Sequence, residues 1–198
     1  MNAGVAPAAP GLLGALGGGD AGHVWWYLSR AAGLCAYVLL TLDVALGLAV
    51  RTRRLEPWLA RWRAFDLHRF TALLLVAVAA LHVLALLGDR YIGFSLPQLL
   101  VPFAAPYRPL WTALGVLALY LLLAIVASFF VRRVIGQRAW RRLHYLTFAV
   151  FALALLHGVL AGTDAGTVWG VLLYLSTGGT VGALAWWRFR RAGAPVDR

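Results

Sequence analysis

Charged residues and cysteine are both scarce in this sequence. Only 13% of its 198 residues are charged, seven of them are acidic, and Cys35 is its single cysteine. A lone cysteine excludes an internal disulfide, and within a helix it serves more often in packing than in chemistry. Hydrophobic residues make up 62% of the chain, whereas ordinary soluble domains are roughly half apolar. The composition therefore predicts an integral membrane protein.

Stretches of about ten residues with alternating polar and apolar character are also missing, which argues against a transmembrane β-barrel. Instead, nearly uncharged runs of about twenty residues recur, each long enough to cross a hydrocarbon core of about 30 Å as a helix. A backbone in lipid must satisfy its own hydrogen bonds, so we expect an all-α membrane bundle. The expected bundle has five transmembrane helices, at about Val24–Val50, Leu67–Leu87, Leu110–Val131, Leu143–Ala161 and Thr167–Trp187.

The net charge of +11 comes from arginines that gather on one side of this bundle. Residues 51–69, 132–142 and 188–198 hold most of them, whereas the opposite side has only Arg90 and Arg108. By the positive-inside rule the arginine-rich side is cytoplasmic, which places the N-terminus outside and the C-terminus inside. We interpret most of these arginines as contacts to anionic lipid headgroups and expect no nucleic-acid partner. The expected location is the inner (plasma) membrane, crossed several times.

We expect three regions along the chain. Residues 1–22 are rich in Gly, Ala and Pro and lack a basic segment, which predicts a disordered extracytoplasmic tail rather than a cleaved signal peptide. Residues 23–191 form the transmembrane domain, and residues 192–198 form a cytoplasmic tail. The apolar, proline-rich outer loop from Tyr91 to Pro109 is expected to fold over the bundle, with a short helix around Pro97–Phe103 that does not span the membrane.

Four of the five histidines fall inside predicted spans, as two similarly spaced pairs. His68 and His82 are fourteen residues apart in the second span, and His144 and His157 are thirteen apart in the fourth. Both spans run from the cytoplasmic side outward, and at about 1.5 Å per residue the members of a pair differ in depth by about 20 Å. The four side chains therefore define two levels, each with one histidine from each helix.

Two facing imidazoles at one depth can bind a haem iron from both sides, so the two levels predict two stacked bis-histidine b-type haems. An iron with both axial positions filled favours electron transfer over oxygen chemistry, and the protein fixes the position and potential of the cofactor. The alternative is that these histidines only bond neighbouring helices. Ionisable residues within membranes are, however, rare and usually functional.

The two histidines of the fourth span do not lie on the same face of a regular helix. At about 100° per residue, His82 returns close to the face of His68, whereas His157 lies about 140° away from His144. A tilt of the helix, a bulge or laterally offset haems would each absorb this difference, and the sequence does not distinguish among them.

Haem propionates need cationic partners. Arg30 lies inside the outer end of the first span, a costly position without a partner, and we expect it to face a propionate of the outer haem; snorkelling to the interface is the alternative. Arg108 in the outer loop is a second candidate for this role. Three arginines flank the inner histidines and can serve the inner haem or lipid: Arg69, Arg141 and Arg142. Asp43 in the first span has no assignable partner.

Several segments resemble bacterial ferric-reductase-like transmembrane proteins. They are WYLSRAAGLCAYVLL in the first span, FDLHRF with a second histidine fourteen residues on, VPFAAPYRPLW in the outer loop, and AWRRLHYLTF with LLHGVLAGTD in the fourth span. This family includes the haem-binding subunit of the periplasmic methionine sulfoxide reductase system and, more distantly, NADPH oxidases and eukaryotic ferric reductases. The resemblance covers roughly residues 24–190. It implies that His68 and His144 hold the inner haem and that His82 and His157 hold the outer one.

NADPH oxidases have six core spans and a cytosolic flavin and nicotinamide domain, whereas five spans and no such domain are expected here. The resemblance therefore implies an oxidoreductase component that receives electrons from a cytoplasmic flavoprotein or a membrane quinol, with flavin or quinone on that partner. The extracytoplasmic acceptor would be ferric iron, oxygen or a partner reductase. Few carboxylates are expected outside, which favours a soluble partner enzyme or a loosely bound acceptor over a dedicated ferric site, since Fe(III) prefers hard oxygen ligands.

Two other functions are compatible with a membrane bundle. A haem-free transporter or channel would use the histidines to line a proton or metal path, but the third and fifth spans carry almost no ionisable residues for a polar route. A structural subunit that only anchors a redox partner would not need paired histidines. The sequence therefore favours a di-haem cytochrome that relays electrons across the membrane.

Overall fold

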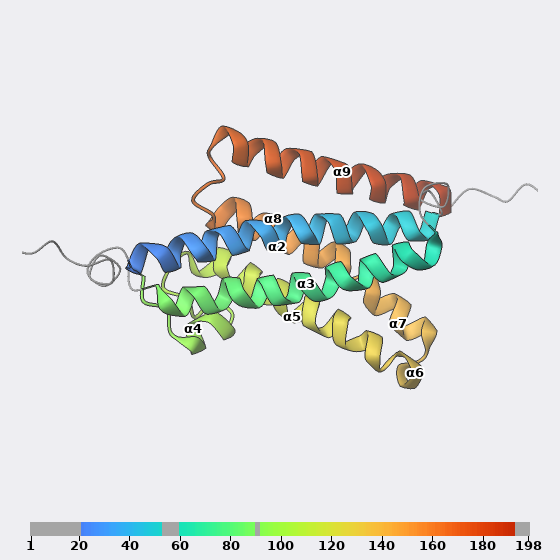
Figure 1. Ribbon diagram of the computed structural model, residues 1–198, viewed down its shortest axis with the longest axis horizontal. Coiled ribbons are helices and arrows are strands. Elements are labelled where there is room, and N and C mark those ends of the chain that lie inside the picture. The colour runs from blue at the N-terminus through green and yellow to red at the C-terminus, as the bar shows by residue number, and fades with distance from the viewer. Residues whose placement is uncertain (1–20, 53–59, 90–91, 193–198) are drawn as a thin grey trace, which may run out of the picture.

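The computed structural model describes residues 21–52, 60–89 and 92–192, and this part of the chain is all-α (Figure 1). The predicted tails therefore lie almost wholly outside the described residues. The helices, in chain order, are α2 (Ala21–Thr52), α3 (Arg61–Gly88), α4 (Leu96–Leu100), α5 (Pro109–Phe130), α6 (Arg132–Ile135), α7 (Gln137–His144), α8 (Thr147–Ala161) and α9 (Val168–Ala192).

The structure confirms the prediction of five helical segments long and apolar enough to cross a membrane. They are Val24–Val50, Arg61–Gly88, Pro109–Phe130, Gln137–Ala161 and Val168–Arg188. The second and fourth begin six residues before the predicted starts, because hydropathy marks only the apolar part of a helix that continues into an arginine-rich end. The fourth segment consists of two helices, α7 and α8.

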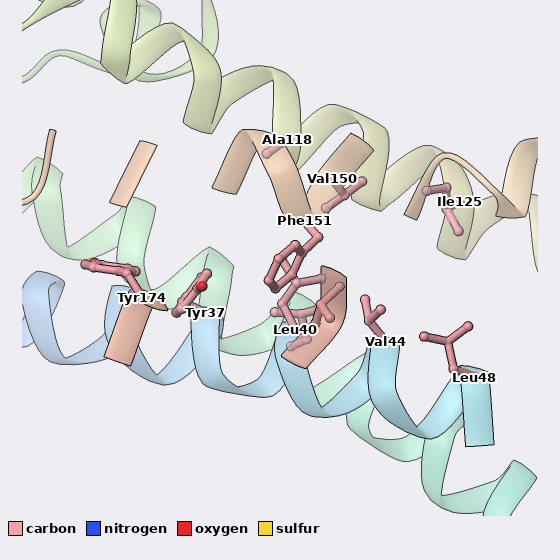
Figure 2. Close-up of a cluster of buried hydrophobic side chains, with 11 residues drawn as sticks. Tyr37, Leu40, Val44, Leu48, Ala118, Ile125, Val150, Phe151 and Tyr174 are labelled. Atoms are coloured by element: carbon pink, nitrogen blue, oxygen red, sulfur yellow. The ribbon is translucent and has the colours of Figure 1, made fainter. Parts of the chain in front are cut away.

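Helices α2 and α3 are consecutive and pack against each other along their length, and α5 packs most closely on α8 (Figure 1). Helix α9 lies along one edge of the bundle, beside α2 and α8. Figure 2 shows the core between these helices, where Tyr37 and Leu40 of α2 meet Phe151 of α8 and Tyr174 of α9. The Tyr37 and Phe151 rings stack with their centroids 5.9 Å apart.

Polar contacts also join the helices. The hydroxyl groups of Tyr37 and Thr177 lie 2.6 Å apart and connect α2 to α9. Hydrogen bonds of this kind stabilise helix association in lipid, where burial of apolar surface gives little driving force.

The outer loop folds over the bundle as expected. Phe94, Leu99 and Ala105 are buried together and pack against Val83 and Leu86 of α3. Helix α4 confirms the predicted short helix, and its first turn is stabilised by the Gln98 side chain, which accepts a hydrogen bond from the Ser95 backbone N–H at 2.9 Å.

The contact between the end of α3 and the start of α2 can be tested at Gly88, where an added Cβ would overlap the Trp25 ring. We expect Gly88→Ala to destabilise the protein by about 1–3 kcal/mol, because overpacking forces the neighbours apart. The measurement is the thermal unfolding midpoint of protein purified in detergent. Gly179→Ala on α9 is the matched control, since nothing lies within 4 Å of its added Cβ. Equal midpoints for the two variants would contradict this packing.

Candidate functional site

The four histidines of the predicted spans form two facing pairs in the structure. The ring centroids of His68 and His144 are 6.1 Å apart, and those of His82 and His157 are 6.4 Å apart. In each pair the ring planes are nearly perpendicular, at 88° and 74°. Each pair joins α3 to the α7–α8 segment, so the structure places one histidine of each helix at each level.

We call His82 and His157 the outer pair and His68 and His144 the inner pair, after the sides of the membrane that the sequence predicts for them. The outer pair is oriented by backbone carbonyl groups. Nδ1 of His82 lies 2.8 Å from the Ser29 carbonyl oxygen, and Nδ1 of His157 lies 2.8 Å from that of Trp111. A carbonyl oxygen only accepts hydrogen bonds, so each Nδ1 carries the proton and donates. Each Nε2 is then the unprotonated nitrogen, which is the form of imidazole that binds a metal.

Three of the four histidine rings lie against glycines of a neighbouring helix. A Cβ added at Gly33 would lie 2.9 Å from His82 Nδ1, and one at Gly115 would lie 2.8 Å from His157 Nδ1. A Cβ at Gly47 would lie 3.3 Å from His68 Cε1. Because a side chain at the first two positions would displace the ring, these glycines form the seats in which the histidines are held.

His144 is held differently, by Trp140 one turn earlier in α7. The two rings stack with centroids 5.1 Å apart and planes at 24°. His144 is also the last residue of α7, and two short-range hydrogen bonds follow it: Leu146 donates to Leu143, and Phe148 donates to Tyr145.

Such i to i+3 bonds are typical of tighter 3₁₀ winding, in which each residue turns by about 120°. These bonds interrupt the regular α-helical repeat between His144 and His157 at the junction of α7 and α8.

Each histidine pair borders a large cavity. The outer cavity has a volume of about 810 Å³ and is lined by His82 and His157. The inner cavity has a volume of about 790 Å³ and is lined by His68 and His144. Both sizes lie at the upper end of the range for cofactor sites. Both cavities have mainly apolar walls, which suits a large flat cofactor with few polar groups.

The residues present fit an iron porphyrin. Metal–imidazole nitrogen bonds are about 2.0–2.1 Å long. Two such bonds on opposite sides of one iron, together with the distance from each nitrogen to its ring centre, match centroid separations of 6.1 and 6.4 Å. Glycines seat the rings of His68, His82 and His157, and the donating Nδ1 atoms of His82 and His157 orient those two rings for such a role.

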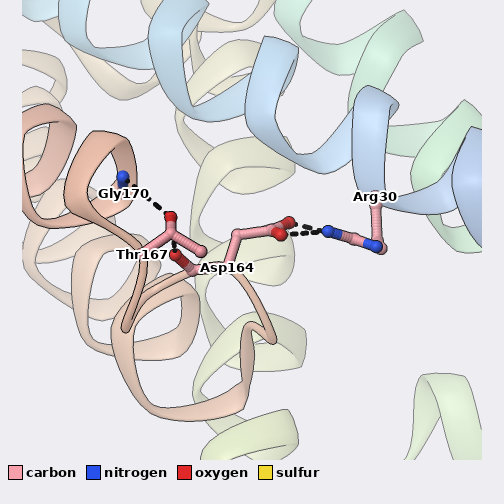
Figure 3. Close-up of polar contacts among 4 residues, drawn as sticks. All are labelled: Arg30, Asp164, Thr167 and Gly170. Atoms are coloured by element: carbon pink, nitrogen blue, oxygen red, sulfur yellow. Dashed lines mark hydrogen bonds and ion pairs between the residues drawn. The ribbon is translucent and has the colours of Figure 1, made fainter.

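Arg30, a predicted propionate partner, forms an ion pair with Asp164 in the loop between α8 and α9 (Figure 3). Its Nε donates to Asp164 Oδ2 at 2.9 Å, and its Nη2 donates to the other carboxylate oxygen. The guanidinium also lies over the Trp26 ring, 4.1 Å from its centroid. Arg30 still borders the outer cavity, so its charge is close to any group bound there.

The other predicted arginines occupy different environments. Arg108 donates through Nη1 to the Leu160 carbonyl oxygen at 2.6 Å, at the end of α8, and is not among the residues that line the outer cavity. Arg69 and Arg141 line the inner cavity, whereas Arg142 does not.

Sequence reasoning found no partner for Asp43, but the structure provides two. Its Oδ1 atom lies 2.9 Å from His68 Nδ1 and accepts a hydrogen bond from the Thr71 hydroxyl at 2.5 Å. The signal in the sequence was the acidic residue itself, since an unpartnered carboxylate inside a span is costly. Its partner could not be read from the sequence, because it depends on the register between α2 and α3.

The ion pair at the outer end predicts coupled effects on stability. We expect Arg30→Met and Asp164→Asn each to lower the thermal unfolding midpoint, and the double variant to cost less than the two single changes together. The coupling energy should be about 1 kcal/mol, because Arg30 is partly exposed. A double-mutant cycle on detergent-purified protein measures it. Strictly additive effects would show that the pair contributes nothing to stability.

A comparison with known protein families agrees with this geometry. Residues 32–155, more than half of the chain, match the family described as ferric reductase like transmembrane component. The match includes His68, His82 and His144, and it ends two residues before His157. Neither curated proteins nor solved structures gave a match. The chain therefore belongs to the ferric-reductase-like transmembrane component family, which typically binds haem and transports electrons.

Proposed function

We propose that the protein is a di-haem b-type cytochrome that relays electrons across the membrane. The observation that carries this proposal is the pairing of four intramembrane histidines at two levels, with ring separations of 6.1 and 6.4 Å. In this assignment His68 and His144 hold the inner haem, and His82 and His157 hold the outer haem. When bound, each haem supplies a one-electron redox centre with no open coordination position.

The role of the chain is to hold the two centres and keep water away from them. Leu40, Leu122 and Val150 line both cavities, so only a thin layer of aliphatic side chains separates the two sites. In the proposed function, this layer would keep the sites close enough for electron exchange and would interrupt an aqueous path between the two cavities. Such a barrier suits an electron carrier better than a channel or a proton path.

Charged residues near the two cavities support an orientation of the protein in the membrane and suggest partners for the haem propionates. Arg61, Arg69, Arg141 and Arg188 line the inner cavity and are suitable partners for haem propionates. By the positive-inside rule this end faces the cytoplasm of a cell whose inner (plasma) membrane contains the protein. Arg30 is the stronger candidate for an outer propionate because it lines the outer cavity, whereas Arg108 would have to leave Leu160.

We further propose that a cytoplasmic flavoprotein or a membrane quinol donates electrons at the arginine-rich end. An extracytoplasmic acceptor, which is ferric iron, oxygen or a partner reductase, takes them at the outer end. The protein is thus one component of an oxidoreductase, with lipid around it and redox partners on both sides.

Double histidine variants test the assignment of ligands. We expect the wild-type protein to contain two haems per chain and to show the paired α and β bands of reduced b-type haem. Removing both members of one pair, in His82→Ala/His157→Ala, should leave one haem, because the inner pair is intact. Removing one member of each pair, in His82→Ala/His144→Ala, should leave none. Haem content is measured as the pyridine complex, with protein quantified separately.

His23→Ala is the control, since His23 belongs to neither pair, and it should retain both haems. A colourless wild-type preparation would rule out the proposed function and favour a haem-free transporter. Equal haem content in the same-pair and cross-pair variants would refute the pairing even if the protein binds haem.

The orientation can be tested with single cysteines in a Cys35→Ser background. Gly166 lies in the exposed turn before α9, and Arg138 lies at the exposed start of α7. We expect a membrane-impermeant maleimide to label Gly166→Cys on intact cells, and to label Arg138→Cys only after the membrane is permeabilised. The reverse pattern would invert the proposed topology.

A further inference from the structure

Asp43 occupies an unusual position for a carboxylate. It lies inside the α2 span and only 8% of its surface is exposed. Its Oδ1 atom lies 2.9 Å from His68 Nδ1, on the side of the ring that faces α2. The same oxygen accepts the hydrogen bond from Thr71, which fixes the carboxylate against α3.

Among the residues that the structure describes, no arginine compensates the charge of Asp43. Among the described residues, the ion pairs of arginine side chains join Arg30 to Asp164 and Arg69 to Asp66, and His68 is the basic group within ion-pair distance of Asp43. The negative charge of Asp43 therefore acts chiefly on the imidazole ring of His68.

The two histidine levels differ in this respect. At the outer level, His82 and His157 direct Nδ1 at the neutral carbonyl groups of Ser29 and Trp111. At the inner level, the group beside His68 Nδ1 is the Asp43 carboxylate, 2.9 Å away. A full negative charge beside the ring raises its electron density more than a carbonyl dipole does, and it makes Nε2 a stronger donor to a metal.

We infer that Asp43 is a positioning residue that acts through His68 to lower the reduction potential of the inner haem. The inference rests on the proposed function, because it requires a haem between His68 and His144. A more electron-rich ligand and a nearby negative charge both stabilise ferric over ferrous iron. The inner site thereby gives up its electron more readily, which favours transfer from the inner to the outer site.

The arginines around the inner cavity act in the opposite sense, because positive charge stabilises the reduced haem. Arg69 and Arg141 line the same cavity as Asp43. The substitution Asp43→Asn leaves them in place, so it isolates the effect of the carboxylate. Asparagine also keeps the size of the side chain and an oxygen that can still accept a hydrogen bond.

The experiment measures the potential of each haem separately. The His82→Ala/His157→Ala background keeps the inner haem alone, and the His68→Ala/His144→Ala background keeps the outer haem alone. In the first, we expect Asp43→Asn to shift the one-electron equilibrium toward the reduced form by about tenfold, which corresponds to about 59 mV. In the second, the potential should not change. Spectroelectrochemical titration of purified protein gives both values.

Asp66→Asn is the matched control for charge. Asp66 lies two residues before His68, but its side chain is 61% exposed and pairs with Arg69. Solvent and salt screen such a charge, so we expect the inner-haem potential to stay close to that of the background. A shift as large as that of Asp43→Asn would show that contact with His68 is not the cause, and would overturn the inference. Asp43→Glu, which retains the carboxylate, should restore the lower potential at least in part.

The outcomes separate this inference from the proposed function. Wild-type protein without haem would defeat the proposed function itself. Two normal haems and an unchanged inner potential in Asp43→Asn would defeat only the role of Asp43. Asp43→Ser is a second neutral variant with a smaller side chain. Selective loss of the inner haem from both variants in the otherwise wild-type chain would support an action of Asp43 through His68 at the inner site. Loss of both haems would contradict it.

Discussion

The close approach of α2 to α3 determines where two of the four histidines lie. Gly33 and Gly47 are fourteen residues apart on α2, and the rings that rest on them, His82 and His68, are fourteen apart on α3. Two antiparallel helices rise by the same amount per residue, so equal spacing on both places each ring on a glycine. Small residues at such contacts let helices approach closely in lipid, where packing and hydrogen bonds replace the hydrophobic effect. The glycines that hold the two histidine rings are therefore the same residues that let α2 and α3 pack closely.

The two ionisable groups within the first span also join α2 to its neighbours. Arg30 and Asp43 would each be costly in a membrane without a partner, and each has one: Asp164 for Arg30 and His68 for Asp43. The first pair fastens α2 to the loop between α8 and α9, near the outer end. The second ties α2 to the inner histidine level. The two interactions thus brace α2 against the rest of the bundle close to each cavity.

Much of this architecture could be predicted from the sequence, because its signals are local. Hydropathy gave the five spans, and the spacing of His68, His82, His144 and His157 gave two levels. The partners of Arg30 and Asp43 could not be predicted in this way. Asp164 is 134 residues from Arg30, and only the packed bundle brings the two together. Nor does a regular helical repeat reveal the tighter winding after His144, because that winding depends on a few backbone hydrogen bonds between α7 and α8.

Helix α9 lies outside the region that matches the family, yet it helps to enclose both cavities. Tyr174 lines the outer cavity and packs against Tyr37, while the Tyr37–Thr177 hydrogen bond fixes this part of α9 to α2. At the other end, Arg188 lines the inner cavity and donates to the Tyr145 hydroxyl at 3.1 Å, beside the break that positions His144. The helices that hold the histidines, α3 and α7–α8, thus fix the positions of the two sites. Among the described residues, α9 adds Tyr174 to the wall of the outer cavity and Arg188 to that of the inner one, so a single helix helps to enclose both sites.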